Sequence, residues 1–222
     1  MKIFYMALKF KKIKVDKKVN YGFLDKQQKP VKFKNRIGLG QVHQNRIICL
    51  SRPTRKRFFA GFDGSITNQK GITLTVNVAD CFPIYLYDAK NKTVGLLHSG
   101  WRGTVRNISG RAIAMMVKQF SSKAKNIRAC IGPGIRSCHF EIKKDVINKF
   151  KKYPDAIIKK ADGLFVDLPN IIKTQLTKTG VALKNIQDCK ECTFCDAKKY
   201  FSFRRDKHGK PKTMLAYISL VA

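Results

Sequence analysis

The sequence predicts a mixed α/β (α+β) fold, because strand and helix patterns alternate along one chain without an internal repeat or low-complexity linker. Residues 72–78 alternate between apolar and polar side chains, and residues 94–97 form a short apolar run, as strands do. Residues 105–120 instead place apolar side chains at helical spacing. We therefore expect mixed β-sheets flanked by helices around one continuous core, with some neighbouring strands antiparallel.

The length of 222 residues and the apolar fraction of 44% fit one domain spanning residues 1–222. No stretch approaches the roughly 18 consecutive apolar residues that cross a bilayer. Residues 1–8 resemble a signal peptide only weakly, because the apolar run is short and meets lysines without a small-residue cleavage site. We expect a first strand there and a cytoplasmic protein.

The elements follow in order along the chain. A possible strand ends at Val42, and strands are expected over residues 72–78, 82–88 and 93–97, the last of them central because it is continuously apolar. A helix should follow Gly103, with apolar positions up to Phe120.

The second half continues the alternation. A strand is expected over residues 127–131 and a helix over 142–152. A further helix should begin after Asp167, with Pro169 in its first turn and Gly180 just beyond its end. The tail reads as a hairpin of strands over residues 200–205 and 213–221, with a turn at 206–210.

The net charge of +32 comes from lysines spread along the whole chain, which holds only two glutamates, Glu141 and Glu191. We interpret this as a biased composition and not as one nucleic-acid-binding patch, because no helix-turn-helix, RNA-binding or zinc-finger pattern accompanies it. The charge still favours attraction to anions, including phosphorylated small molecules. We expect no specific nucleic acid and no membrane partner, and oligomeric state stays open.

The seven cysteines suit a reducing compartment. Cys189, Cys192 and Cys195 have a spacing like that of an iron–sulfur or zinc site, but no fourth cysteine follows, so we expect no metal there. His139 and His208 lie in lysine-rich surroundings and are expected to be ordinary surface residues.

Three residues of metal-binding or nucleophilic type lie where expected strands give way to loops: His43, Cys81 and His98. Two imidazoles and one thiolate suit a tetrahedral zinc ion with one position left for water. Glycines at positions 100 and 103 let the backbone turn sharply beside His98.

Cys81 alone has three interpretations: an inert buried thiol, a nucleophile or a thiolate ligand. Its neighbour Asp80 can orient a histidine or a water, but as an acid it raises the pKa of the thiol and disfavours a free nucleophile. A metal removes that difficulty by deprotonating the thiol.

Six motifs in a fixed order resemble the laccase-domain family, also called the multicopper polyphenol oxidoreductase or peptidoglycan-editing-factor family. The resemblance covers residue 37 to the C-terminus. The motifs are Gln41-Val42-His43, Asp63-Gly64-Ser65-Ile66-Thr67, Ala79-Asp80-Cys81-Phe82-Pro83-Ile84, His98-Ser99-Gly100-Trp101-Arg102-Gly103-Thr104, Cys130-Ile131-Gly132-Pro133-Gly134-Ile135 and Phe201-Ser202-Phe203-Arg204-Arg205-Asp206.

The resemblance implies a fold related to toxin cysteine-hydrolase domains and a zinc site formed by His43, Cys81 and His98. It also implies activity on purine nucleosides: deamination of adenosine to inosine, or phosphorolysis of adenosine, inosine, guanosine and methylthioadenosine. The older laccase name of the family implies copper binding and phenol oxidation. Members of the family are also linked to the quality control of peptidoglycan precursors.

The chain departs from the family after Gly22-Phe23, where members carry an arginine-glycine-glycine element. Residues 24–27 replace it, so deamination is favoured over phosphorolysis, with Lys26 as a poorer substitute for the arginine. Arg102 and Arg205 are our candidates for binding phosphate or transition-state charge, because a guanidinium forms paired hydrogen bonds to oxyanions. Each alternatively forms a structural salt bridge. Gln41 is a third substrate-binding candidate.

Three alternatives remain beside a zinc-dependent nucleoside enzyme. A copper oxidase is disfavoured, because four histidines are too few for several copper centres. A metal-free Cys81–His98 hydrolase or amidase acting on a cell-wall precursor is the second. A basic binding protein driven by charge alone is the third.

Overall fold

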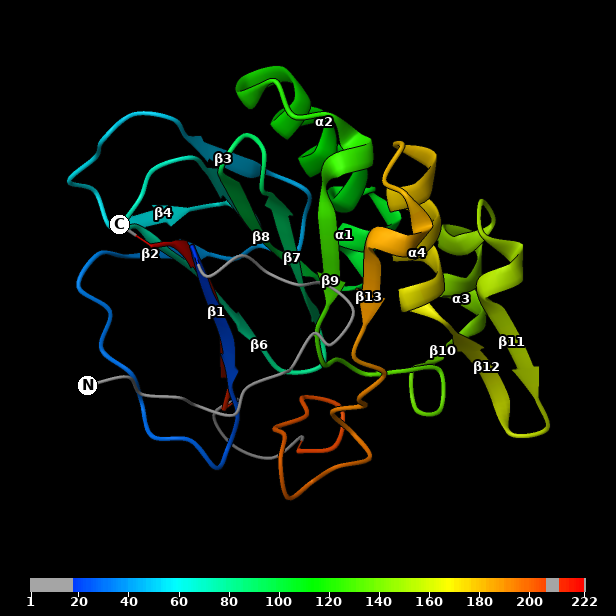
Figure 1. Ribbon diagram of the computed structural model, residues 1–222. Coiled ribbons are helices and arrows are strands. Elements are labelled where there is room, and N and C mark those ends of the chain that lie inside the picture. The colour runs from blue at the N-terminus through cyan, green and yellow to red at the C-terminus, as the bar shows by residue number, and fades with distance from the viewer. Residues whose placement is uncertain (1–17, 207–211, 222) are drawn as a thin grey trace.

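The computed structural model describes residues 18–206 and 212–221. The strand expected over residues 1–8, residues 207–210 of the expected turn, and His208 within that turn lie outside the described residues. The described residues form three sheets (Figure 1). The five-stranded sheet has the order β1-β14-β6-β2-β4, from β1 (Val19–Leu24), β14 (Met214–Leu220), β6 (Thr73–Val78), β2 (Arg36–Gly40) and β4 (Phe58–Ala60).

The largest sheet is six-stranded, with β7 and β8 in its middle. Its order is β13-β9-β7-β8-β5-β3, from β13 (Ile186–Asp188), β9 (Arg128–Ile131), β7 (Phe82–Asp88), β8 (Thr93–Ser99), β5 (Gly64–Thr67) and β3 (Ile47–Leu50). A three-stranded sheet, β10-β12-β11, comprises Glu141–Ile142, Gly163–Val166 and Ile157–Lys160.

The helices are short. They are α1 (Trp101–Val105), α2 (Ile108–Phe120), α3 (Lys144–Ile147) and α4 (Leu168–Lys178), and four 3-10 turns accompany them at Ala124–Asn126, Asn148–Phe150, Pro154–Ala156 and Leu183–Asn185. None of the helices built from described residues has the length and apolar character to span a bilayer.

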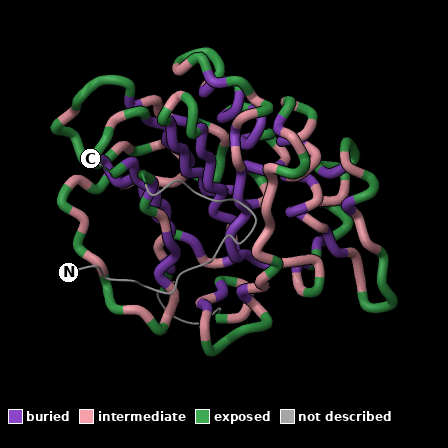
Figure 2. The backbone as a smooth tube through the Cα atoms, in the orientation of Figure 1, coloured by how far each residue is buried: buried purple, intermediate pink, exposed green. Residues whose placement is uncertain are grey.

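The six-stranded sheet lies between α2 and α4 on one face and the five-stranded sheet on the other (Figure 1). Strand periodicity sends alternate side chains to opposite faces. Ile84 and Leu86 of β7 therefore pack toward the helices, whereas Tyr85 and Tyr87 pack toward the five-stranded sheet. One continuous core was expected, but this sheet divides the core into two apolar clusters. The strands of this sheet are largely coloured as buried in Figure 2.

The predicted mixed α+β class is confirmed, as are the strands at β6, β7, β8 and β9 and the helix α4. Asp167 caps α4 by accepting a hydrogen bond from the backbone N–H of Asn170 at 3.1 Å. The central position expected of the strand over residues 93–97 is also correct, although β8 continues to Ser99.

The helix expected after Gly103 is interrupted. Helix α1 ends at Val105, and α2 starts anew at Ile108. Asn107 causes the break, because its backbone is left-handed (φ 56°) and its side chain caps α2 by accepting the N–H of Gly110 at 3.1 Å. The helix expected over residues 142–152 is likewise only α3 followed by a 3-10 turn.

The expected C-terminal hairpin is wrong. Residues 200–205 form no strand, and β14 pairs with β1 and β6 instead. The backbone N–H of Arg204 and the hydroxyl of Ser202 donate to the carboxylate of Asp80, at 2.7 and 3.0 Å. These long-range hydrogen bonds fold the segment into a turn, which local sequence pattern does not reveal.

Replacing Leu86 with alanine should lower the free energy of unfolding by about 2–5 kcal/mol, because a fully buried side chain in β7 leaves a cavity between sheet and helices. Chemical denaturation monitored by circular dichroism measures this. Leu183→Ala is the control, since that side chain is 70% exposed, and its cost should stay within about 0.5 kcal/mol. Equal costs for both variants would contradict the assignment of the core.

Candidate active site

His43, Cys81 and His98 meet where strand ends from two sheets converge. His43 follows β2, Cys81 lies between β6 and β7, and His98 is the penultimate residue of β8. Strands β2 and β6 are parallel, so their carboxyl ends lie at one edge, and the pairing of β7 with β8 brings His98 to the same place. Their ligand atoms all lie within 4.8 Å of one another.

Asp63, which precedes β5, positions both histidines. Its fully buried carboxylate accepts the Nδ1–H of His98 at 2.9 Å and the backbone N–H of His43 at 2.8 Å. The same carboxylate accepts the backbone N–H of Gln44 at 2.8 Å. This contact at Nδ1 leaves Nε2 of His98 to face a ligand. The left-handed backbone of His43 (φ 57°) is held by these hydrogen bonds.

The thiol of Cys81 and the imidazole of His98 stabilise each other's charged forms. Burial raises the pKa of Cys81, but the charge of His98 and hydrogen bonds from both imidazoles lower it to about 7. Burial lowers the pKa of His98, but the charge of Cys81 and the hydrogen bond to Asp63 raise it to about 9. Cys81 is therefore ready to act as a thiolate near neutral pH.

Two glycines make room for this cluster. A Cβ atom at Gly100 would lie 2.7 Å from the Sγ of Cys81, and one at Gly103 would lie 2.7 Å from the carbonyl oxygen of Gln44. Both distances are shorter than any contact such a carbon can make, so a side chain at either position would displace the thiol or the loop carrying His43.

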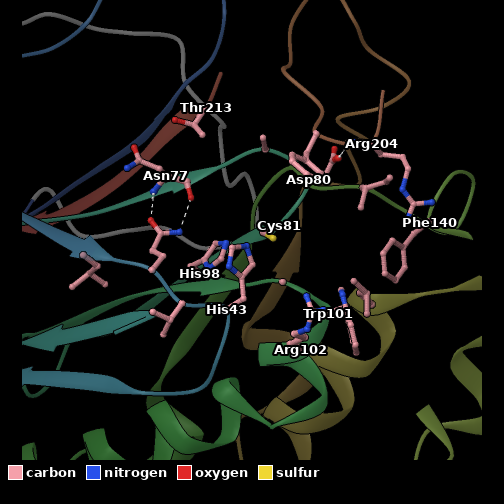
Figure 3. Close-up of a pocket in the computed structure, with 18 residues that line it drawn as sticks. His43, Asn77, Asp80, Cys81, His98, Trp101, Arg102, Phe140, Arg204 and Thr213 are labelled. Carbon is pink, nitrogen blue, oxygen red and sulfur yellow. Dashed lines mark hydrogen bonds between the residues drawn. The ribbon is translucent and has the colours of Figure 1, made fainter. Parts of the chain in front are cut away.

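The cluster opens into a cavity of about 790 Å³ (Figure 3). This volume lies in the range of roughly 300–1,000 Å³ typical of small-molecule sites. The surface of the cavity is mainly apolar, and the residues that line it are Leu39, Gln41, Val42, His43, Asn77, Ala79, Asp80, Cys81, His98, Gly100, Trp101, Arg102, Ile135, Phe140, Leu168, Phe203, Arg204 and Thr213.

Two arginines and three aromatic residues line the cavity and offer cationic groups and flat rings to a ligand. The guanidinium of Arg102 lies 4.5 Å from the ring centre of Trp101, and no ion pair among the described residues includes Arg102. Arg204 donates two hydrogen bonds to the carbonyl of Glu141, both at 3.2 Å, and lies over the ring of Phe140. Phe203 is 66% exposed at the cavity wall.

Gln41 lines the cavity, but the nitrogen and the oxygen of its side-chain amide both form hydrogen bonds with the backbone of Asn77, at 2.8 Å each (Figure 3).

Arg205 does not line the cavity. The guanidinium of Arg205 donates to Asp206 and to the carbonyls of Thr193, Phe194 and Tyr200. The contacts of Arg205 therefore fit the alternative interpretation, a structural salt bridge, which it forms with Asp206. Arg204 lines the cavity instead.

Lys26, considered as a replacement for the missing arginine, is also occupied elsewhere. Its ammonium donates to the carbonyl of Ala197 at 2.9 Å and lies over the ring of Phe201.

Asp80 does not orient a histidine, because its carboxylate accepts hydrogen bonds from Thr193, Ser202 and the backbone of Arg204. Asp63 has that orienting position; it opens one of the six motifs, but no spacing within its own segment indicates its contacts with the two histidines.

The donor set at this site fits a metal ion. Two imidazoles and a thiol that ionises at about pH 7 are the ligand types zinc prefers, and their atoms lie close enough to share one ion. The hydrogen bond from His98 to Asp63 is the supporting contact that metal-bound histidines almost always have.

The fold and the site together define a mixed α+β protein with a histidine–cysteine–histidine donor set in a ligand-sized cavity. The chain belongs to the family described as multi-copper polyphenol oxidoreductase laccase, whose model matches residues 18–220.

Named relatives and a solved structure agree with this membership. A mouse protein named purine nucleoside phosphorylase LACC1 is 33% identical over 72% of this chain, and a prokaryotic protein named adenosine deaminase RL5 is 34% identical over 74%. The chain spans 38% and 64% of the length of these two relatives. The crystal structure of YfiH from Bacillus licheniformis superposes with a TM-score of 0.84, at 25% identity, covering 91% of this chain and 92% of that one.

Alkylation of Cys81 in metal-free protein should accelerate as pH rises through about 7, because the thiolate forms above that pKa. Mass spectrometry of the peptides after iodoacetamide treatment measures the rate at each pH. Cys49 is the internal control, since burial raises its pKa above the ordinary 9.0 and its reaction should require more alkaline conditions. Identical pH profiles for the two thiols would contradict the pairing of Cys81 with His98.

Proposed function

We propose that this chain acts, as one catalytic domain, as a zinc-dependent purine nucleoside enzyme that deaminates adenosine or cleaves purine nucleosides with phosphate. The observation that carries the proposal is the convergence of His43, Cys81 and His98 at a cavity of about 790 Å³. The names of the two relatives, purine nucleoside phosphorylase and adenosine deaminase, suggest the substrate class.

His43, Cys81 and His98 would hold the metal. A zinc ion bound there supplies a Lewis acid and a water whose pKa is lowered to near 7. The protein's own contribution is to keep the three donors in place. Asp63 fixes the ring of His98 and the backbone of His43, and Gly100 leaves space for the thiolate.

The cavity walls suit a nucleoside. A purine is flat and aromatic, and Phe203, Phe140 and Trp101 offer rings for it to stack on. The apolar wall excludes water from the base, while the donors of the cluster face the polar edge or the sugar. Burial of the base against aromatic rings orients the reacting carbon toward the donor cluster.

Arg102 is the best-placed group for phosphate or developing negative charge. It lines the cavity beside the donor cluster, and its ring contact with Trp101 leaves its N–H groups available to an oxyanion. Arg204 is the second cation in the wall, but it also serves the carbonyl of Glu141. With Lys26 and Arg205 bound elsewhere, phosphorolysis depends on Arg102, whereas deamination needs no phosphate site.

A metal-free hydrolase is the second candidate, and one observation favours it. Cys81, His98 and Asp63 form a nucleophile, a base and an orienting carboxylate, which is the arrangement used in acyl transfer. This candidate predicts activity on an amide, such as a cell-wall precursor, that survives chelators. A copper oxidase stays the least favoured, because four histidines are too few for several copper centres.

The partners that we propose are purine nucleosides and phosphate, in the cytoplasm. All seven cysteines are free thiols, which fits a reducing compartment.

Replacing Cys81 with alanine should abolish both adenosine turnover and the metal of this site, because a thiolate ligand is lost. Chromatography of adenosine reactions with and without phosphate separates inosine from free adenine, and plasma mass spectrometry counts the metal. Cys49→Ala is the matched control and should keep both. Full turnover in Cys81→Ala would exclude this site, and adenosine turnover that persists in wild type after the metal is removed by a chelator would contradict the zinc dependence.

A further inference from the structure

A second cluster of metal-binding side chains lies on the segments that follow β9 and β13. Cys138, His139, Cys192 and Cys195 place one donor atom each within 4.8 Å of one another. The Sγ of Cys138 lies 3.5 Å from both other sulfurs, and the Nδ1 of His139 lies 3.3 Å from the Sγ of Cys195. This set shares no residue with the candidate active site.

The distances match one tetrahedral ion. Zinc binds thiolate sulfur at about 2.3 Å and imidazole nitrogen at about 2.0–2.1 Å, which puts neighbouring ligands of a tetrahedron roughly 3.5–3.8 Å apart. Three sulfurs and one nitrogen make a closed set with no position left for water. Such a set is typical of structural zinc sites and not of catalytic ones.

The sequence pattern alone concealed this cluster. Cys189, which opens the apparent spacing, is not a member, and the other two ligands, Cys138 and His139, come from the segment after β9. The parallel pairing of β9 with β13 continues as a bridge between Gly134 and Cys192, which brings the two segments side by side. His139, expected to be an ordinary surface residue, therefore lies against Cys195.

Surrounding contacts fix the donors. The ring of His139 stacks on Phe194 at 4.0 Å between centres and 18° between planes. Arg136 forms a paired salt bridge with Asp188, at 3.0 and 2.7 Å, just before each ligand segment. Arg205 donates to the carbonyls of Thr193 and Phe194 and so holds the turn between Cys192 and Cys195.

Cys138, Cys192 and Cys195 are all free thiols. A disulfide would use two of the three thiols and leave the third thiol and the imidazole without a role, whereas one cation uses all four donors.

We propose that Cys138, His139, Cys192 and Cys195 bind one structural zinc ion, separate from the metal of the candidate active site. The ion would clamp the segment after β9 to the segment after β13. Between two of the ligands, the hydroxyl of Thr193 donates to Asp80 at 2.6 Å, and Asp80 precedes Cys81. The clamp therefore supports the wall of the cavity that carries Arg204 and Phe140.

Metal content of single variants tests this proposal. Protein purified without an affinity tag should contain about two zinc ions per chain by plasma mass spectrometry, and Cys138→Ser and Cys195→Ser should each contain about one. Cys189→Ser is the matched control, because this thiol lies three residues before Cys192 but outside the cluster, and it should keep both ions.

The variants of the two sites separate the two proposals. Loss of one ion in Cys81→Ala and of the other in Cys138→Ser supports both. One ion per chain that Cys138→Ser removes and Cys81→Ala does not supports the structural site while the proposed function fails. Wild-type metal content in Cys138→Ser and Cys195→Ser, or a disulfide between any of these cysteines in intact-mass analysis, would overturn the structural site.

Cobalt substitution keeps the proposal testable if a serine variant does not fold. Metal-free Cys81→Ala protein titrated with Co²⁺ should develop the intense sulfur-to-cobalt charge-transfer absorption of a tetrahedral site with three thiolates. No such absorption would overturn the proposal, because the four donors of the cluster remain in that variant.

Discussion

The carboxylate of Asp63 determines the geometry of the candidate active site more than any ligand does. It is fully buried, and it accepts the imidazole N–H of the buried His98 and the backbone N–H groups of His43 and Gln44. Hydrogen bonds to a charged group contribute about 1.5–3 kcal/mol each. One buried anion thereby fixes two histidines that come from different sheets and keeps one of them in a left-handed conformation.

A second buried carboxylate, Asp80, performs the corresponding task on the opposite wall. It accepts hydrogen bonds from Thr193, from Ser202 and from the backbone of Arg204. These bonds bring a segment more than a hundred residues away in sequence against the loop of Cys81. The proposed structural zinc ion would hold the same segment at Cys192 and Cys195, in addition to its hydrogen bonds to Asp80.

The net charge of +32 takes on a more specific meaning in this setting. Most of the lysines are spread over the surface, where they attract anions without selecting among them. Among the described residues, Arg102 and Arg204 are the arginines that line the cavity. Long-range attraction of anions by the surface is thus distinct from the proposed binding of phosphate at the cavity.

Local pattern was sufficient for elements whose burial is repetitive. The alternation over residues 72–78 and the apolar run before His98 predicted β6 and β8, and the cap at Asp167 predicted α4. The motif resemblance selected His43, Cys81 and His98, which do converge.

Features that depend on long-range contacts were missed for a physical reason. The turn at residues 201–206, the orienting role of Asp63 and the ligand cluster that includes Cys138 and His139 all arise between segments distant in sequence. No period or spacing within one segment encodes them. Arg205 was expected near the substrate but lies outside the cavity, where it donates to backbone carbonyls that a sequence does not display.

The most direct test of this account is the zinc affinity of Asp63→Asn, measured by competition with a fluorescent chelator in a Cys138→Ser background that leaves only the candidate active site. The asparagine keeps the size of the side chain but removes the charge that orients His98. Zinc binding should be about 10–100-fold weaker than in the parent, with a parallel loss of adenosine turnover. Unchanged affinity and turnover would contradict the orienting role of Asp63.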